Sequence, residues 1–198
     1  MMNDKLTKRL LVSLIVLVFT AGPASAPNMV VDGSFEFGNV GEDTWINAAG
    51  DGETFGAWTG HPSGATHIWL YDDNGASASD GTASAHLGDG YTAASISQLV
   101  SGFTIGETYE VSLAAIAYAD GTSHPGGGLK VTDLDTALDD LDVTFAVNPG
   151  ALGDPMIYSS FLFNASNTEL DLSIFSPGSD GENNIWAATH VDDVSITL

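Results

Sequence analysis

Two adjacent carboxylates interrupt an apolar stretch near the end of the sequence, in the segment HVDDVSITL. Asp192 and Asp193 are flanked by Val191, Val194 and Ile196, in a pattern typical of a β-strand beside a hydrophobic core. Burying an unpaired carboxylate costs several kcal/mol even after the surroundings relax. The two side chains must therefore either bind a compensating group or lie in solvent.

A second set of residues with usable chemistry is aromatic. Tyr and Trp rings present apolar faces with a polar handle, and such faces can stack on the C–H surface of a sugar while nearby polar groups bind its hydroxyls. Five aromatic residues stand next to predicted loops and are candidates for ligand binding: Trp69, Tyr71, Tyr91, Tyr118 and Trp186. The alternative for each is that it caps the core or an edge of the fold.

The sequence contains no signature of a catalytic site. The histidines show no metal-ligand spacing and are predicted to be isolated surface or edge residues: His61, His67, His86, His124 and His190. The motifs G-x-S-x-G and H-E-x-x-H and the P-loop are absent, and without cysteine there is no thiol nucleophile. We assign no catalytic residue, although the two carboxylates of a glycosidase can be far apart in sequence.

Short β-strands must position these residues. In residues 169–174, apolar and polar side chains alternate, as in a strand with one buried and one solvated face. Similar segments recur between Gly-, Asp- and Pro-rich turns, and residues 28–31 and 189–198 are the first and last predicted strands. No window has a sustained helical repeat, which predicts a single all-β domain: an antiparallel β-sandwich.

An acidic stretch at residues 133–141 is predicted to form a solvated loop with one helical turn. Asp133, Asp135 and Asp139 are spaced loosely like calcium ligands. The stretch lacks the Gly and the Glu that an EF-hand loop requires at fixed positions, so we do not assign a metal to it.

Residues 1–26 have the features of a secretory signal peptide. Basic residues precede an apolar run from Leu10 to Thr20, and small residues follow, with cleavage predicted after Ala24 or Ala26. The run is shorter than the roughly 20 residues needed to span a bilayer, which disfavours the alternative of an uncleaved anchor. We therefore expect a secreted domain at 27–198 without stable membrane insertion.

The charge of the mature chain restricts its partners. The full sequence has 4 basic and 26 acidic residues, and removal of the leader leaves Lys130 as the one basic residue, with a formal charge of −24. Such a surface repels phosphate backbones, so nucleic acid is excluded as a partner. A secreted domain without disulfides must depend on its core or on a metal for stability.

Five short motifs occur in order along the chain between residues 28 and 198. They are VVDGSFEFG, GAWTG, SISQLV, GETYEVSL and HVDDV. Together they resemble secreted bacterial carbohydrate-binding modules and related domains with a galactose-binding-like jelly roll. The resemblance implies the jelly-roll form of the β-sandwich, and it implies that Trp58 is a packing residue in the core or at its rim.

The resemblance also addresses the two adjacent aspartates. In such domains the first and last strands lie side by side, which would bring Glu36 to Asp192 and Asp193, and many hold a structural Ca²⁺ there. Calcium takes six to eight oxygen ligands from carboxylates and carbonyls in irregular geometry. Strand alternation favours Asp192 as the ligand and Asp193 as the outward residue, with Asp32 as a further candidate. The alternative is a solvated acidic strand end without an ion.

These observations predict a secreted, non-catalytic module that binds extracellular or cell-wall polysaccharide and is stabilised by calcium. The alternatives are an acidic structural or matrix protein of the cell envelope, or a glycoside-active enzyme.

Overall fold

A computed structural model of the chain describes residues 26–37, 44–63, 68–72, 79, 81–90, 93–119, 127–145, 147–150, 155–177 and 187–198. The regular elements in these ranges are all strands. They include no helix that is long and apolar enough to cross a membrane.

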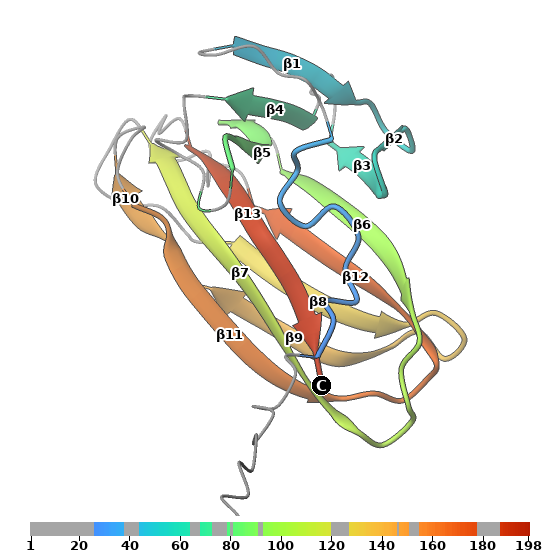
Figure 1. Cartoon of the computed structure of the whole chain (residues 1–198). Helices are drawn as coiled ribbons and strands as arrows, with labels where there is room; N and C mark the ends of the chain where they lie inside the picture. The colour runs from blue at the N-terminus through green and yellow to red at the C-terminus, as the bar shows by residue number, and fades with distance from the viewer. Residues whose placement is uncertain are drawn as a thin grey trace, which may run out of the picture.

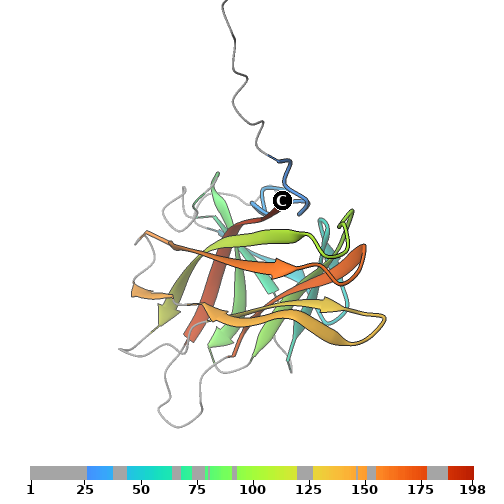
Figure 2. The same cartoon turned by 90° about the horizontal axis from the view of Figure 1, so that it is seen from below.

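The strands form two sheets that face each other as layers (Figures 1 and 2). Sheet A has the order β1 (Thr44–Ala49), β4 (Ile68–Asp72), β5 (Ala83–Gly90), β13 (Ala187–Thr197), β7 (Thr108–Ala119) and β10 (Asn148–Gly150), and β11 (Ile157–Asn164) also pairs with β7. Sheet B has the order β2 (Thr54–Phe55), β3 (Trp58–Pro62), β6 (Ala94–Ser101), β12 (Glu169–Ser176), β8 (Gly127–Asp133) and β9 (Leu138–Phe145). Neighbouring strands are antiparallel except for β10 and β7, which confirms the predicted β-sandwich.

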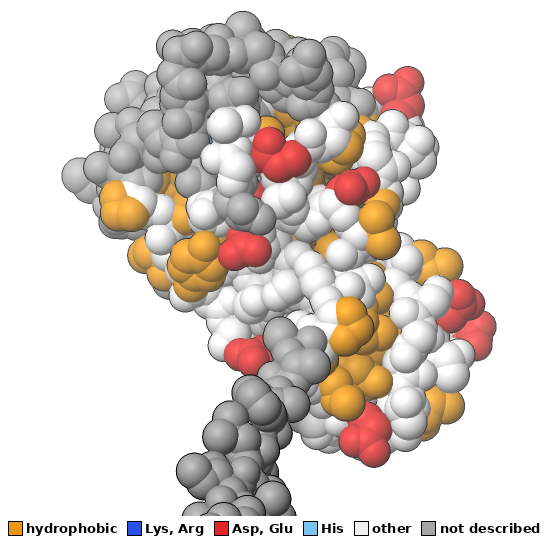
Figure 3. Space-filling model, viewed as in Figure 1, with side chains coloured by type: hydrophobic (Ala, Val, Ile, Leu, Met, Phe, Trp, Pro, Cys, Tyr) orange, Lys and Arg blue, Asp and Glu red, His pale blue; other side chains and the backbone are white. Residues whose placement is uncertain are grey.

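Acidic residues dominate the charge of the described surface. Asp and Glu side chains are visible on the described part of the face in Figure 3, where no Lys or Arg side chain is seen. Lys130, the basic residue of the part of the chain that the structure describes, donates from Nζ to Asp142 at 2.8 Å and to Asp139 at 3.2 Å. Hydrogen bonds to these two carboxylates raise the pKa of Lys130, and the bond to Asp142 is the largest cause. The ammonium group therefore remains charged.

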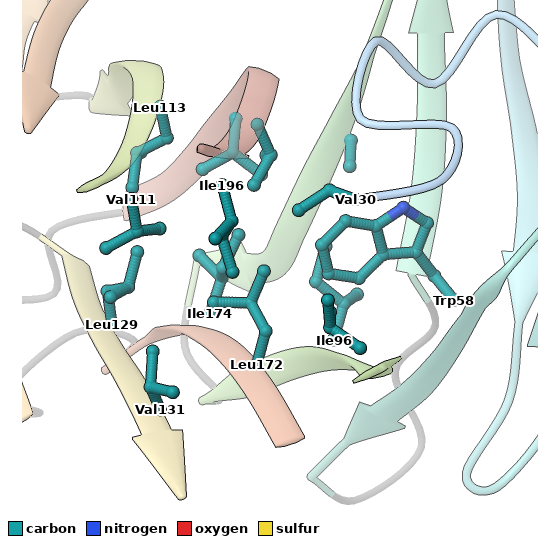
Figure 4. Close-up of a cluster of buried hydrophobic side chains, with 14 of the residues drawn as sticks. Val30, Trp58, Ile96, Val111, Leu113, Leu129, Val131, Leu172, Ile174 and Ile196 are labelled. Carbon is teal, nitrogen blue, oxygen red and sulfur yellow. The ribbon is translucent and has the colours of Figure 1, made fainter. Parts of the chain in front are cut away.

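The core lies between the two sheets and follows the predicted alternation (Figure 4). Leu170, Leu172 and Ile174 of β12 are fully buried, and the polar residues between them point to the opposite face of sheet B. Val111 and Ile196 contribute to the same core from sheet A. Complete burial of a large aliphatic side chain stabilises a fold by about 1.5–3 kcal/mol, so this alternating layer supplies much of the stability.

The N-terminal segment is not a regular strand, so the predicted strand at residues 28–31 is wrong. The segment nevertheless lies beside β13, because Met29 N donates to Ile196 O at 2.9 Å and Val194 N donates to Gly33 O at 3.0 Å. A side chain at Gly33 would collide with the carbonyl oxygen of Val194. The backbone at Gly33 therefore lies directly against the backbone of Val194, and this contact holds the N-terminal segment against the last strand.

A β-bulge separates the two aspartates of β13. The register with β7 shifts between Asp192 and Ser195, and Asp193 has a left-handed φ of 48°. The extra residue allows Val191 and Val194 to enter the same core with two residues between them. Asp192 therefore points away from the core on sheet A and Asp193 occupies the bulge.

The acidic stretch that follows β8 is a tight turn leading into β9. Ala137 N donates to Asp133 O at 2.7 Å, which is the i→i+4 bond of one helical turn, but no regular helix forms because β9 begins at Leu138. Asp133 is buried rather than solvated, and its carboxylate accepts hydrogen bonds from Asp135 N at 3.0 Å, Thr136 Oγ1 at 2.9 Å and Asn167 Nδ2 at 3.1 Å. The hydrogen bond from Asn167 is the largest of the causes that lower the pKa of Asp133. The charge is thus stabilised by local donors.

Candidate functional site

Strand alternation and register place three of the five predicted aromatic positions on one face of sheet A. Trp69 of β4 pairs with His86 of β5, His86 pairs with His190 of β13, and His190 pairs with Ile116 of β7. Residues that are directly opposite each other in a sheet belong to the same face. This row lies on the side of sheet A away from the core, because the core residues alternate with it.

Two more predicted positions fall next to this row. In the backbone ladder, Tyr71 is opposite Ser84 and Tyr118 is opposite Ala188, two residues along from the row on either side. Their side chains, like the whole of Tyr91 and Trp186, lie outside the described residues. The strands to which Tyr91 and Trp186 are joined pair with each other at their last described residues, Gly90 and Ala187.

A buried polar chain runs through the same row, and sequence reasoning missed it. His86 Nδ1 is 2.9 Å from His190 Nε2, and His190 Nδ1 is 3.2 Å from Ser84 Oγ. The two rings meet edge to face with their centroids 4.6 Å apart. Burial of His190 lowers its pKa to about 3, so its ring is neutral at pH 7.

The prediction of isolated surface or edge histidines is therefore wrong for His86 and His190. His67 and His124 lie outside the described residues. The two histidines are 104 residues apart in the sequence, so a period-two pattern cannot pair them without the register between β5 and β13.

The middle of this face is covered. His86, His190, Ile116 and Ala188 are all buried, whereas Trp69 is half-buried and keeps exposed area. A ligand would thus meet Trp69 and the neighbouring loops rather than a flat, open sheet surface.

The two predicted calcium carboxylates converge on one short segment. Glu36 Oε1 accepts hydrogen bonds from the backbone of Thr82 and Ala83, both at 2.7 Å. Asp192 Oδ2 accepts from Ser79 N at 2.7 Å and from Ser79 Oγ at 3.1 Å. Ser79 and Thr82, just before β5, and Ala83, its first residue, are thus held by one carboxylate from the N-terminal segment and one from the last strand.

The other two acidic candidates are placed differently. Asp193 is half-buried in the bulge, and Asp32 is exposed with a left-handed φ of 53°. The backbone carbonyl of Asp32 accepts from Trp58 Nε1 at 3.1 Å, which is a structural contact. Across the described ranges, no three His, Asp or Glu side chains lie together as a metal-binding group.

The fold has solved counterparts, although no known protein-family profile and no curated protein sequence matches the chain. TmCBM61, solved in complex with β-1,4-galactotriose, superposes with a TM-score of 0.55 at 15% identity, over 86% of this chain and 98% of its own. A putative sugar binding protein from Bacteroides thetaiotaomicron gives 0.54 at 10% identity, over 86% and 99%. The chain has the fold of a carbohydrate-binding-module-like jelly roll.

A part of a longer protein has the same jelly-roll architecture. The enzymatically active domain of tailspike protein 4 from bacteriophage CBA120 matches with a TM-score of 0.55 at 12% identity, over 86% of this chain and 21% of its own. Identities of 10–15% describe the fold and do not assign a ligand.

The tryptophan of the GAWTG motif has the packing role that the resemblance implies. Trp58 is fully buried, and its ring lies 5.4 Å from that of Phe35, between centroids. Together with its hydrogen bond to the Asp32 carbonyl, this contact attaches the N-terminal segment to the core of the jelly roll.

Proposed function

We propose that this chain is a secreted, non-catalytic module that binds extracellular or cell-wall polysaccharide. The observation that carries the proposal is that Trp69 and the backbone positions of Tyr71 and Tyr118 belong to one face of sheet A. These positions come from two separate strands, β4 and β7, and the register puts them in three consecutive rows, with the Trp69 row in the middle. The similarity of the fold to TmCBM61, which was solved with a galactotriose, supports the same ligand class.

Trp69 is the aromatic residue of this group whose side chain is described, and it is the first to test. Trp69→Ala should abolish or greatly weaken retention on the insoluble polysaccharides that hold the wild-type protein, and the thermal midpoint should change little because the ring is only half-buried. Tyr158→Ala is the matched control, since Tyr158 is 60% exposed on β11, toward the opposite edge of the same sheet. Pull-down on a panel of insoluble glycans measures the effect.

Three outcomes would count against the proposal. Loss of retention that always accompanies unfolding would make Trp69 a core residue. A wild-type protein that no glycan retains would favour the acidic matrix protein of the cell envelope. Release of reducing sugar during incubation would favour the glycoside-active enzyme.

Structural calcium is part of the proposal, with Glu36 and Asp192 as its carboxylate ligands. Asp192 is fully buried, and Lys130, the basic residue of the mature chain, is bound to two other carboxylates. Oxygen donors of mixed kind suit Ca²⁺, and the remaining ligands would be backbone carbonyls. The ion would balance the two acidic charges that hold residues 79–83.

Export of the precursor is the last part of the proposal. Intact-mass analysis of protein recovered from the extracellular medium should find a chain that begins at Ser25 or Pro27, because the basic start and the short apolar run of residues 1–26 fit a cleaved leader. A secreted product that retains Met1 would contradict it.

A further inference from the structure

The outer face of sheet B is an open polar surface that the sequence patterns did not single out. Two neighbouring rows cross five strands of this sheet. The first consists of His61, Ser95, Phe175, Gly128 and Thr144, and the second of Thr59, Ser97, Ser173, Lys130 and Asp142. Apart from Gly128, their side chains are half-buried or exposed, unlike the covered middle of the corresponding face of sheet A.

A single aromatic ring lies at the centre of the first row. A Cβ atom at Gly128 would fall among the distal ring atoms of Phe175, so the ring rests directly on the backbone of β8. The absence of a side chain at Gly128 creates the place that the ring occupies. Phe175 nevertheless remains half-buried rather than buried, which leaves part of an apolar ring at the surface.

Hydroxyl and imidazole groups lie beside this ring. His61 Nε2 lies 3.2 Å from Ser97 Oγ, and Ser173 Oγ donates to Asp171 Oδ2 at 2.6 Å. These side chains stand on β3 and β6, to one side of Phe175 in the sheet, and on β12, the strand of Phe175 itself. An aromatic surface bordered by short polar groups is the arrangement that binds a ring with apolar C–H faces and hydroxyl edges.

The charges on this face select among such ligands. Lys130 forms salt bridges with Asp139 and Asp142. These carboxylates raise the pKa of Lys130, so its ammonium group stays charged and stays bound to them. Asp171 adds a third carboxylate to the same face, next to Ser173. A glycan with carboxylate or sulfate groups would be repelled here, whereas a neutral glycan would find acceptors for its hydroxyls.

We propose that this face, centred on Phe175, is a second binding surface that takes a neutral polysaccharide chain laid across β6, β12 and β8. Strands are about 4.8 Å apart, so a row of five strands extends about 19 Å, enough for more than one sugar ring. The ligand class rests on the proposed function, but the surface is distinct from the Trp69 end of sheet A.

Affinity electrophoresis in gels that contain a soluble neutral polysaccharide tests the surface. The probes are β-1,4-galactan and a panel of other neutral glycans, with polygalacturonate as the anionic counterpart. Phe175→Leu keeps apolar volume but removes the ring, and should weaken retardation by about two- to tenfold, the range expected for one aromatic contact. Phe175→Tyr keeps the ring and should retain binding. Leu162→Ala, at a residue 68% exposed on sheet A, is the matched control.

A second variant guards against an effect of folding. Gly128→Ala leaves Phe175 in the chain but places a methyl group where the ring lies, so it should weaken binding as Phe175→Leu does. Thermal midpoints identify any variant that has lost its fold. If Phe175→Leu or Gly128→Ala has unfolded, the other of the two is compared with the wild-type protein.

The outcomes separate this proposal from the proposed function. If neutral glycans retard the wild-type protein and both variants equally, while Trp69→Ala abolishes retardation, the second surface is wrong and the proposed function stands. If no neutral glycan retards the wild-type protein, the proposed function is wrong as well. Retardation by polygalacturonate as strong as by the neutral probes would overturn the neutral ligand.

Discussion

Removal of calcium should lower the thermal midpoint of the mature chain by about 5–10 °C. An ion that binds only the folded state at a hundredfold excess over its Kd stabilises that state by about 2.7 kcal/mol. For a domain of this size, each kcal/mol moves the midpoint by about 2–4 °C. The reason for the effect is the pair Glu36 and Asp192, whose negative charges both converge on residues 79–83.

Single substitutions should locate that response. Asp192→Asn and Glu36→Gln keep hydrogen-bond acceptors for residues 79–83 but remove one charge each, so the difference between midpoints with Ca²⁺ and with EDTA should nearly vanish. Asp193→Asn should matter less, since Asp193 is half-buried in the bulge. Asp139→Asn is the control, because Asp139 contacts Lys130 and Thr132 instead.

Differential scanning calorimetry on protein shown to be free of metal measures both effects. A midpoint that EDTA leaves unchanged would mean that the two carboxylates serve only as acceptors for residues 79–83. The alternative of an acidic strand end without an ion would then hold for Glu36 and Asp192.

The layer structure of the fold was predictable because it depends on local alternation. Residues 169–174 alternate regularly, and Leu170, Leu172 and Ile174 form one wall of the core as expected. The N-terminal segment misled the prediction, since Val30 is buried like a strand residue although its backbone does not join a ladder. There, contacts with β13 and with Gln98, whose amide bonds Val31 at both N and O, replace regular pairing.

The sites were predictable only in part, because they depend on contacts between distant strands. The aromatic candidates could be identified one by one from the loops beside them, and alternation along β4 puts Trp69 and Tyr71 on one face, yet only the register shows that Tyr118 of β7 belongs to the same face. The Phe175 surface was missed altogether. The ring of Phe175 can lie on the sheet because the neighbouring strand has a glycine, Gly128, opposite it. This pairing of β12 with β8 has no signature in the sequence.

Burial of polar groups was the least predictable property. Asp133 was expected to be solvated because it stands in an acidic stretch, but its donors come from the turn itself and from Asn167 across a strand connection. His86 and His190 were expected at the surface because histidine is often found there. In the structure each ring has a polar neighbour on an adjacent strand, which makes its burial tolerable.

Acidification from pH 6.5 to 5 should destabilise the protein through His190. The folded state holds this ring neutral, with its pKa lowered to about 3 by burial, whereas the unfolded chain takes up a proton near the ordinary value of 6.5. Because the unfolded state binds more protons below pH 6.5, the free energy of unfolding falls by about 1.4 kcal/mol for each pH unit, until the pH reaches the folded pKa. Above pH 6.5 the group contributes no pH dependence.

Thermal midpoints at constant Ca²⁺ and constant ionic strength should therefore fall by about 3–6 °C for each pH unit in this window. Asp133 and Asp139 do not contribute in this window, since their pKa values are lowered from 3.8 and they lose their stabilising charge only in stronger acid. His190→Gln keeps a side chain able to bond both Ser84 and His86 but cannot gain a charge, so its midpoint should depend less on pH. His61→Gln changes a ring that is exposed on sheet B and should keep the wild-type slope. Equal slopes for wild type and His190→Gln would assign the acid sensitivity to other groups and leave the His86–His190 pair a purely packed contact.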